Sequence, residues 1–148
     1  MEKVVEEVLN RHNNNTSILS VLKDVQEKCR YLPEEAISQV AEGLGVSINE
    51  VYEVATFYSF LSTGLLGENV IRICKSTPCF LKSCDVIVET VEKELGIGIG
   101  QTTEDNKFSL QLTNCIGACD KAPAMMINDK IYGNLTSEKV IEILKEYK

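Results

Sequence analysis

The sequence predicts an α+β protein of two units, a bundle of helices followed by a domain that combines strands and helices. Two observations indicate this fold class. Apolar residues recur at helical spacing through residues 1–62, whereas short runs typical of strands first occur after residue 67. The segment 62–67, with two glycines, separates the patterns. We therefore expect a helical bundle over residues 1–66 and a second domain over residues 67–148.

The first two helices are predicted from apolar residues three or four positions apart. An asparagine run at 13–15 separates them, and Thr16 or Ser17 is a typical cap for the start of the second helix. The apolar faces consist of Val4, Val5, Val8 and Leu9 in the first helix and Ile18, Leu19, Leu22 and Val25 in the second.

The next two helices are predicted from their end signals. Pro33 suits the first turn of a third helix, the two glutamates after it favour the positive helix end, and Gly45 ends the helix. Residues 47–50, Ser-Ile-Asn-Glu, form a capping box that starts a fourth helix, which we expect to run to about Leu61.

The second domain begins with a short buried strand over residues 70–73. An amphipathic helix follows over residues 85–95 and ends at Gly96, and a loop leads to residues 108–112. Those five residues alternate strictly between apolar and polar, which predicts a half-buried strand. A hairpin and a last helix complete the domain; the hairpin strands are 124–127 and 130–132, and Thr136 or Ser137 caps the helix.

This order of elements is that of a thioredoxin-like sandwich. Two strands joined through a helix are expected to be parallel, and the hairpin adds antiparallel strands at the edge. Thioredoxin-like folds have a cis-proline just before the third strand, and Pro123 occupies that position here. We therefore predict a cis bond between Ala122 and Pro123.

Charge and composition exclude several classes of function. The net charge of −7 and the pI near 4.8 argue against nucleic-acid and anionic membrane partners. Residues 41–47 resemble a helix-turn-helix, but residues 31–62 contain five glutamates and no lysine or arginine, which excludes a DNA-reading helix. No apolar run is long enough to span a bilayer, and no export signal precedes the six cysteines, so we expect a cytoplasmic protein with reduced thiols and no membrane insertion.

Four of the cysteines form two tight pairs, each placed directly after a predicted strand. Cys74 and Cys79 follow the first strand, and Cys115 and Cys119 follow the second. The ends of parallel strands meet at one sheet edge, so all four thiols are expected to share one inorganic site. The looser spacings favour a [2Fe–2S] cluster over zinc, which prefers tighter knuckles; a metal-free thiol oxidoreductase lacks its usual C-x-x-C motif.

Segments from both units resemble the thioredoxin-like [2Fe–2S] ferredoxins. This family includes the 24-kDa-type subunit of NADH:quinone oxidoreductase and its relatives in NAD-linked hydrogenases, including electron-bifurcating ones, and formate dehydrogenases. The resemblance runs from about residue 16 to the end of the chain and is carried by residues 25–35, 51–58, 115–119 and 122–133.

The resemblance implies that Cys74, Cys79, Cys115 and Cys119 are the cofactor-binding residues and metal ligands of one [2Fe–2S] cluster. It also implies a partner subunit that binds FMN and NAD(P)(H), and further iron–sulfur subunits in the same oxidoreductase complex. The sequence departs from the family pattern at two positions. Phe80 stands where the family usually has histidine, and Cys84 stands where it usually has a small residue.

The remaining candidates have simpler interpretations. Cys84 is expected to be a small buried residue at the start of a helix, although a swap with a ligand stays open. Cys29 is expected to be core or inert surface, and His12 is not expected to bind metal. Lys75, Lys82 and Lys121 flank the ligands and either raise the reduction potential, dock an acidic partner or are ordinary solvated charges.

A one-electron cluster needs a flavin neighbour to divide an electron pair, and the sequence has neither a G-x-G-x-x-G motif nor a P-loop. We therefore expect an electron-transfer subunit that is not catalytic alone. For the parent complex, the first expectation is a soluble NAD(P)-linked hydrogenase or formate dehydrogenase. The alternative is the peripheral arm of a respiratory NADH:quinone oxidoreductase. A zinc-stabilised interaction module is the alternative of another class.

The helical bundle is expected to dock the flavin subunit. Its last helix carries a group of aromatic residues, which in most proteins would belong to the core but here are expected to be partly exposed. They are Tyr52, Phe57, Tyr58 and Phe60.

Overall fold

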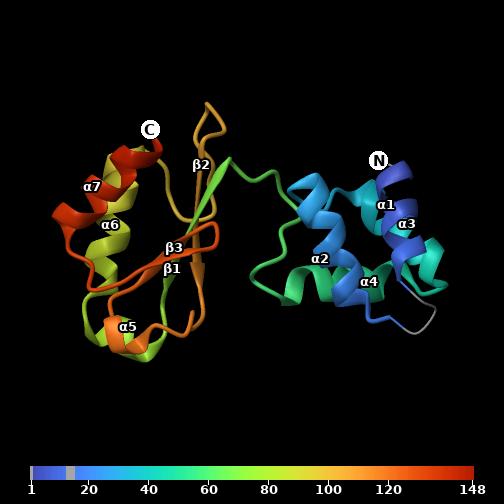
Figure 1. The fold of residues 1–148 in the computed structure, drawn as a ribbon, viewed down its shortest axis with the longest axis horizontal. Helices are drawn as coiled ribbons and strands as arrows, with labels where there is room; N and C mark the ends of the chain where they lie inside the picture. Colours follow the sequence, from blue (N-terminus) through green and yellow to red (C-terminus); the bar gives the residue numbers. More distant parts are fainter. Residues whose placement is uncertain (1, 13–15) are drawn as a thin grey trace. The chain divides into compact units, whose positions relative to one another are not determined.

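The computed structural model describes residues 2–12 and 16–148, and the chain divides into two compact units, which Figure 1 shows. The first unit ends at Leu65 and the second begins at Leu66. The asparagine run at 13–15 lies outside the described residues. No helix in the described part of the chain is long and apolar enough to cross a membrane.

The first unit consists of helices whose ends follow the predicted signals. Ser17 caps the second helix by accepting a hydrogen bond from the backbone N–H of Ser20, and Gly45 ends the third helix in the left-handed conformation (φ +67°). Ser47 and Glu50 form the predicted capping box. The helices are α1 (Glu2–Arg11), α2 (Ile18–Cys29), α3 (Glu34–Leu44) and α4 (Ile48–Phe57).

Two details of these helices differ from the prediction. Pro33 is the residue before α3 and has extended backbone angles, so it stands at the N-cap position, without a side-chain cap, and not in the first turn. Helix α4 ends at Phe57, four residues earlier than expected. The side chain of Gln26 explains the early end, since it donates to the carbonyl of Phe60 (2.7 Å) and accepts from the N–H of Ser62 (2.6 Å). These bonds hold the following segment against α2.

The core of the helical unit is formed by one face of each helix. The predicted faces of α1 and α2 are confirmed in Val5, Val8, Leu22 and Val25, all of which are buried. Ile18 and Leu19 only pack against the edge of this core. The core also includes Val21, Leu32, Ala36, Ile37, Val40, Ala41, Val51, Ala55 and Leu61.

The second unit contains a four-stranded sheet with the order β2-β1-β3-β4. Strand β1 (Asn69–Cys74) is parallel to β2 (Phe108–Thr113), as predicted, with Cys74 opposite Thr113. Strand β3 (Met125–Ile127) is antiparallel to β1 and forms the predicted hairpin with β4 (Lys130–Tyr132). The Ala122–Pro123 bond is cis, which confirms the prediction.

Two helices cover one face of this sheet, as Figure 1 shows. They are α6 (Cys84–Leu95) and α7 (Ser137–Tyr147). Their apolar residues pack against alternate residues of the central strands, and the core includes Ile71, Ile73, Leu110, Met125 and Ile127 from the sheet and Ile87, Val91, Val140 and Leu144 from the helices. The resulting architecture is α+β, a helical bundle followed by a thioredoxin-like domain.

The strand predicted over residues 108–112 is confirmed as β2, but the expected half-buried pattern is wrong at Ser109, which is 2% exposed. Its hydroxyl accepts from the N–H of Gly67 (2.7 Å) and lies 2.7 Å from the hydroxyl of Thr102. A buried hydroxyl with two partners escapes most of its desolvation cost. The prediction also missed α5 (Thr77–Leu81), a five-residue helix directly before α6.

Candidate iron–sulfur site

The two cysteine pairs are positioned by the ends of the parallel strands. Cys74 is the last residue of β1, and its N–H donates to the carbonyl of Ala124 (3.2 Å). The N–H of Lys75 donates to the carbonyl of Thr113 at the end of β2 (2.9 Å). Cys115 follows two residues later. The strands therefore deliver both pairs at one edge of the sheet, as the sequence predicts.

The first pair is buried together with a third thiol. Cys74 and Cys79 are each 1% exposed, and Cys84 is 5% exposed. They form one cluster with the small residues Ala118 and Ala124. Cys84 is the first residue of α6, so it is a buried residue at a helix start, and its thiol belongs to the same group as Cys74 and Cys79.

The second pair is exposed to solvent. The sulfurs of Cys115 and Cys119 are 3.3 Å apart, and the N–H of Gly117 lies 3.4 Å from the sulfur of Cys115 and donates to it. Gly117 has φ +79°, a conformation that favours glycine and that turns its N–H toward the sulfur. The short 3₁₀ helix η1 (Cys119–Lys121) follows directly.

The loop that carries the exposed pair packs against the buried pair, because Ala118 and Ile116 contact the thiol cluster. Burial raises the pKa of Cys74, but the N–H and hydroxyl of Ser76 and the thiol of Cys79 donate to its sulfur. The N–H of Ile116, between the two exposed cysteines, also donates to it, and together these bonds hold the pKa of Cys74 below its ordinary value. Loop 115–119 is thus in contact with the buried pair.

The pKa values of Cys79, Cys84 and Cys119 are shifted in the opposite direction, above the ordinary value of a thiol. Burial raises the pKa of Cys79 to about 11, with a further contribution from the neighbouring thiols. The pKa of Cys119, which is exposed, is raised mainly by its hydrogen bond with Cys115. Bound iron would lower the pKa values of the thiols that coordinate it, because a coordinating thiol is deprotonated.

The residues present fit a [2Fe–2S] cluster. Four thiols from two loops supply the soft donors that iron–sulfur clusters require, and the residues between and behind them, Gly117, Ala118 and Ala124, are small. Among residues 2–12 and 16–148, no group of three or more His, Cys, Asp or Glu side chains is arranged to hold a single metal ion.

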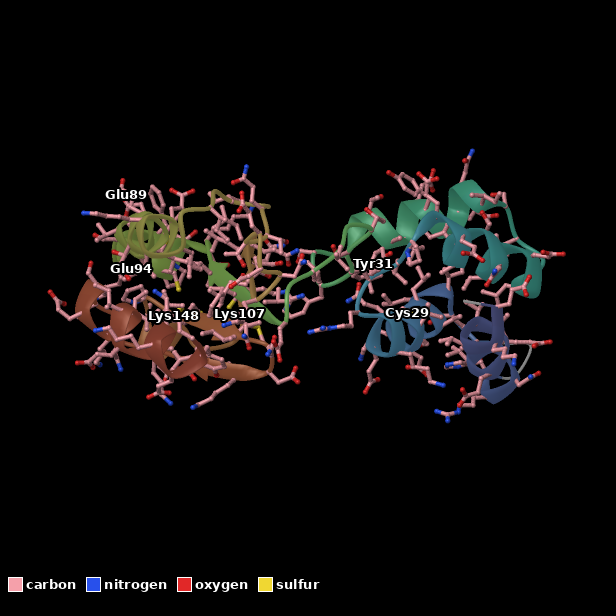
Figure 2. The ribbon with its side chains drawn as sticks, turned by 90° about the horizontal axis from the view of Figure 1, so that it is seen from above. Cys29, Tyr31, Glu89, Glu94, Lys107 and Lys148 are labelled. Carbon is pink, nitrogen blue, oxygen red and sulfur yellow. The ribbon has the colours of Figure 1, made fainter. Side chains whose placement is uncertain are left out.

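The remaining candidates lie outside this site. Cys29 belongs to the helical unit, at the end of α2 (Figure 2), and packs against the helical core. His12 lies 2.8 Å from the carboxylate of Asp24 in a part-buried contact within the helical unit. Phe80, at the position where a histidine is usual, is 64% exposed.

The aromatic residues of the helical unit lie on its surface. Their exposed fractions are 50% for Tyr52, 79% for Phe57, 41% for Tyr58 and 46% for Phe60. These residues are therefore not part of the core. Partial exposure of the group was expected, and all four side chains are exposed. The early end of α4 contributes, since it removes Tyr58 and Phe60 from any helical face.

A bundle of helices joined to a thioredoxin-like domain with four thiols at one sheet edge defines an iron–sulfur protein of the ferredoxin class. The chain belongs to the thioredoxin-like [2Fe–2S] ferredoxin family, whose sequence profile matches residues 4–148. The spacing of the cysteines left zinc and a [2Fe–2S] cluster open, and the family decides for the cluster.

Several relatives have closely similar sequences. The chain is 42% identical over 137 residues to a subunit of NADH-quinone oxidoreductase from Rickettsia felis, and the match covers 92% of this chain and 82% of the relative. It is 40% identical over 129 residues to the subunit of the same name from Pseudomonas aeruginosa, covering 87% of this chain and 78% of the relative.

A solved structure has the same fold. The NAD⁺-reducing [NiFe]-hydrogenase in its H₂-reduced state includes a chain that matches 88% of this chain with a TM-score of 0.74 and 20% identity. This chain corresponds to only 22% of that hydrogenase chain. At this identity the match establishes the fold alone.

Proposed function

We propose that this chain is the [2Fe–2S] electron-transfer subunit of an NADH-quinone oxidoreductase. The observation that carries the proposal is the similarity to a named subunit of that complex in several organisms, which extends over both units of the chain at 37–42% identity. The partner would be a subunit that binds FMN and NAD(H), beside further iron–sulfur subunits.

This proposal reverses the order of the two parent complexes that the sequence favoured. A hydrogenase or formate dehydrogenase came first in the sequence analysis, and the respiratory complex was the alternative. The support for a hydrogenase is a match in fold at 20% identity, whereas the support for the respiratory complex is sequence similarity at about twice that identity.

Cys74, Cys79, Cys115 and Cys119 are the proposed ligands. When bound, the cluster accepts and releases one electron. The chain itself supplies the thiols and donors that shape the site. The N–H groups of Gly117 and Ile116 donate to sulfur atoms of the site, and hydrogen bonds of this kind favour the more negative, reduced state of a cluster.

The helical unit is proposed as the docking module for the flavin-binding subunit. Its surface exposes a set of large apolar side chains that its own core does not use: Ile48, Tyr52, Phe57, Tyr58, Phe60 and Leu65. Exposed apolar residues at this density are typical of a surface that is covered by another protein.

The first test of this function is spectroscopic. Protein purified without oxygen is expected to absorb in the visible region, to bleach on reduction with dithionite and to give a spin-half EPR signal. Colourless protein with stoichiometric zinc would overturn the proposal and support an interaction module.

The parent complex requires a second experiment. A tagged copy of the chain, isolated from its native host with its partners, is expected to support electron transfer from NADH to a quinone. Hydrogen- or formate-dependent reduction of NAD⁺ by the same material would instead identify the parent complex as a hydrogenase or a formate dehydrogenase.

A further inference from the structure

The stretch from Lys75 to Cys84 forms a thin surface layer that carries two of the buried thiols. Cys79 and Cys84 are the buried residues of this stretch, Ser76 is half-buried, and the others are exposed. Helix α5 lies within it, so successive residues of one short helix face the thiol cluster and the solvent. A protein bound to Phe80 would contact the residue that directly follows Cys79 in the chain.

Two large apolar side chains project from this layer. Phe80 is 64% exposed and Leu81 is 75% exposed, and they directly follow Cys79. Neither belongs to a core cluster. A polar residue would satisfy the fold equally well at these two exposed positions. We therefore infer that the apolar side chains of Phe80 and Leu81 serve a contact outside this unit.

The charges of the same layer are positive. Lys75 and Lys82 are exposed, and residues 75–84 contain no carboxylate, although the whole chain has a net charge of −7. Asp85 lies just beyond the end of the stretch. An apolar pair between two lysines is complementary to an apolar surface rimmed by carboxylates, and such complementarity steers association and fixes register.

We propose that Phe80 and Leu81, flanked by Lys75 and Lys82, form the electron-exchange contact of this chain, which docks onto an acidic, apolar surface of the flavin-binding partner. This inference rests on the proposed function. In the step, the reduced flavin of the partner loses one electron and the oxidised cluster gains it, while the second electron of the flavin passes to the other iron–sulfur subunits. No bond to this chain forms or breaks.

The contact is suited to electron exchange for two reasons. Electron transfer between proteins slows steeply with distance, and Phe80 and Leu81 are exposed residues that directly follow the proposed ligand Cys79. Apolar side chains at the centre of a contact supply most of its binding energy, whereas the surrounding charges mainly raise the association rate. The lysines should therefore mainly raise the rate of association with the partner, and most strongly at low salt.

The test compares opposite charges at one position. Leu81→Glu and Leu81→Lys remove the same apolar side chain, but only the glutamate would face the carboxylates of the partner. The purified holo-chain is mixed with the flavin-binding subunit of the same organism and NADH, and bleaching of the cluster is followed by stopped flow at low and high salt. Ile131→Glu and Ile131→Lys are the controls, because Ile131 is 47% exposed and lies on β4.

Leu81→Glu is expected to slow bleaching at least tenfold relative to Leu81→Lys at low salt, with a smaller difference at high salt and unchanged absorption and EPR spectra. Phe80→Ser is expected to slow it at both salt concentrations. The two Ile131 variants should not differ from each other. Equal rates for both Leu81 variants, or a faster glutamate variant, would overturn the inference.

The outcomes also separate this inference from the proposed function. If NADH and the flavin subunit fail to bleach the cluster of the unmodified chain, the proposed function is wrong. If they bleach it and the Leu81 variants behave alike, the function stands and the contact lies elsewhere. If Phe80→Ser loses its cluster, the two Leu81 variants alone decide whether the contact lies here. Their absorption and EPR spectra show directly whether the cluster is intact.

Discussion

At the scale of single residues, the thiols of the site differ mainly in burial and in their hydrogen-bond partners. Cys74 and Cys79 are enclosed, whereas Cys115 and Cys119 are exposed. Cys84 belongs to the same enclosed group, but it is the first residue of α6 and does not follow a strand.

We predict that alanine at any of the four proposed ligands removes the cluster, while Cys84→Ala keeps it. The physical reason is that a [2Fe–2S] cluster requires four donors, and the two pairs supply them without Cys84. The measurement is iron and acid-labile sulfide per chain, expected to fall from about two of each to almost none in the ligand variants. Loss of iron in Cys84→Ala would contradict the ligand assignment.

Gly67 gives a second prediction at this scale. A β-carbon at this position would lie 2.8 Å from the carbonyl carbon and 2.9 Å from the nitrogen of Phe108, and these backbone atoms belong to β2. Gly67→Ala is expected to destabilise the protein by roughly 1–3 kcal/mol, the usual cost of overpacking. Gly64→Ala is the matched control, because nothing lies within 4 Å of the added carbon there. Denaturant unfolding measures both variants, and equal stability would refute the close approach.

At the scale of elements, the start of α4 depends on its capping box. The N–H of Glu50 donates to the hydroxyl of Ser47 (3.3 Å), and the carboxylate of Glu50 accepts from the N–H of Ser47 (3.0 Å). Ser47→Ala is expected to destabilise the helical unit by about 1 kcal/mol. Far-UV circular dichroism during urea unfolding measures the change, and Ser38→Ala, on the exposed side of α3, is the control.

The same box predicts a pH dependence. The pKa of Glu50 is lowered from its ordinary 4.5, mainly by the hydrogen bonds from the N–H and the side chain of Ser47. A carboxylate with a lowered pKa in the folded state stabilises the fold above its unfolded pKa, and this contribution is lost as the pH falls through the folded value. The stability difference between the unmodified chain and Glu50→Ala should therefore shrink below pH 4.5. A constant difference in the urea midpoint across this range would contradict the shift.

At the scale of the whole molecule, the two units have separate hydrophobic cores. The core of the helical unit is formed by residues between Val5 and Leu61, and the main core of the second unit by residues between Ile71 and Leu144. A substitution in one core is therefore expected to act first on its own unit.

We predict that Leu22→Ala and Leu110→Ala destabilise different units, each by about 2–5 kcal/mol, the usual cost of a large cavity. Both side chains are fully buried. Thermal unfolding of the holo-protein would be followed by visible absorption for the cluster and by far-UV circular dichroism for the helices. Leu22→Ala should lower the helical transition and leave the bleaching temperature unchanged, and Leu110→Ala should lower the bleaching temperature. Equal shifts of both signals in both variants would show one cooperative unit.

The amino-acid sequence by itself determined the features that depend on neighbouring residues. The capping box at Ser47, the end of α3 at Gly45 and the strand that precedes Cys74 follow from side chains a few positions apart. The parallel pairing of β1 and β2 followed from the order of elements, and it brought Cys74 and Cys115 to one edge. The family resemblance, carried by motifs in both units, indicated the cluster.

The tertiary structure alone decided the features that depend on distant residues. Helix α4 ends at Phe57 because Gln26, more than thirty positions earlier, binds the segment after it. Ser109 is buried because Gly67 and Thr102 reach its hydroxyl. The division of the thiols into an enclosed and an exposed pair has the same origin. Local patterns report only on residues within a turn or a strand, whereas these outcomes depend on contacts that form when distant segments pack together.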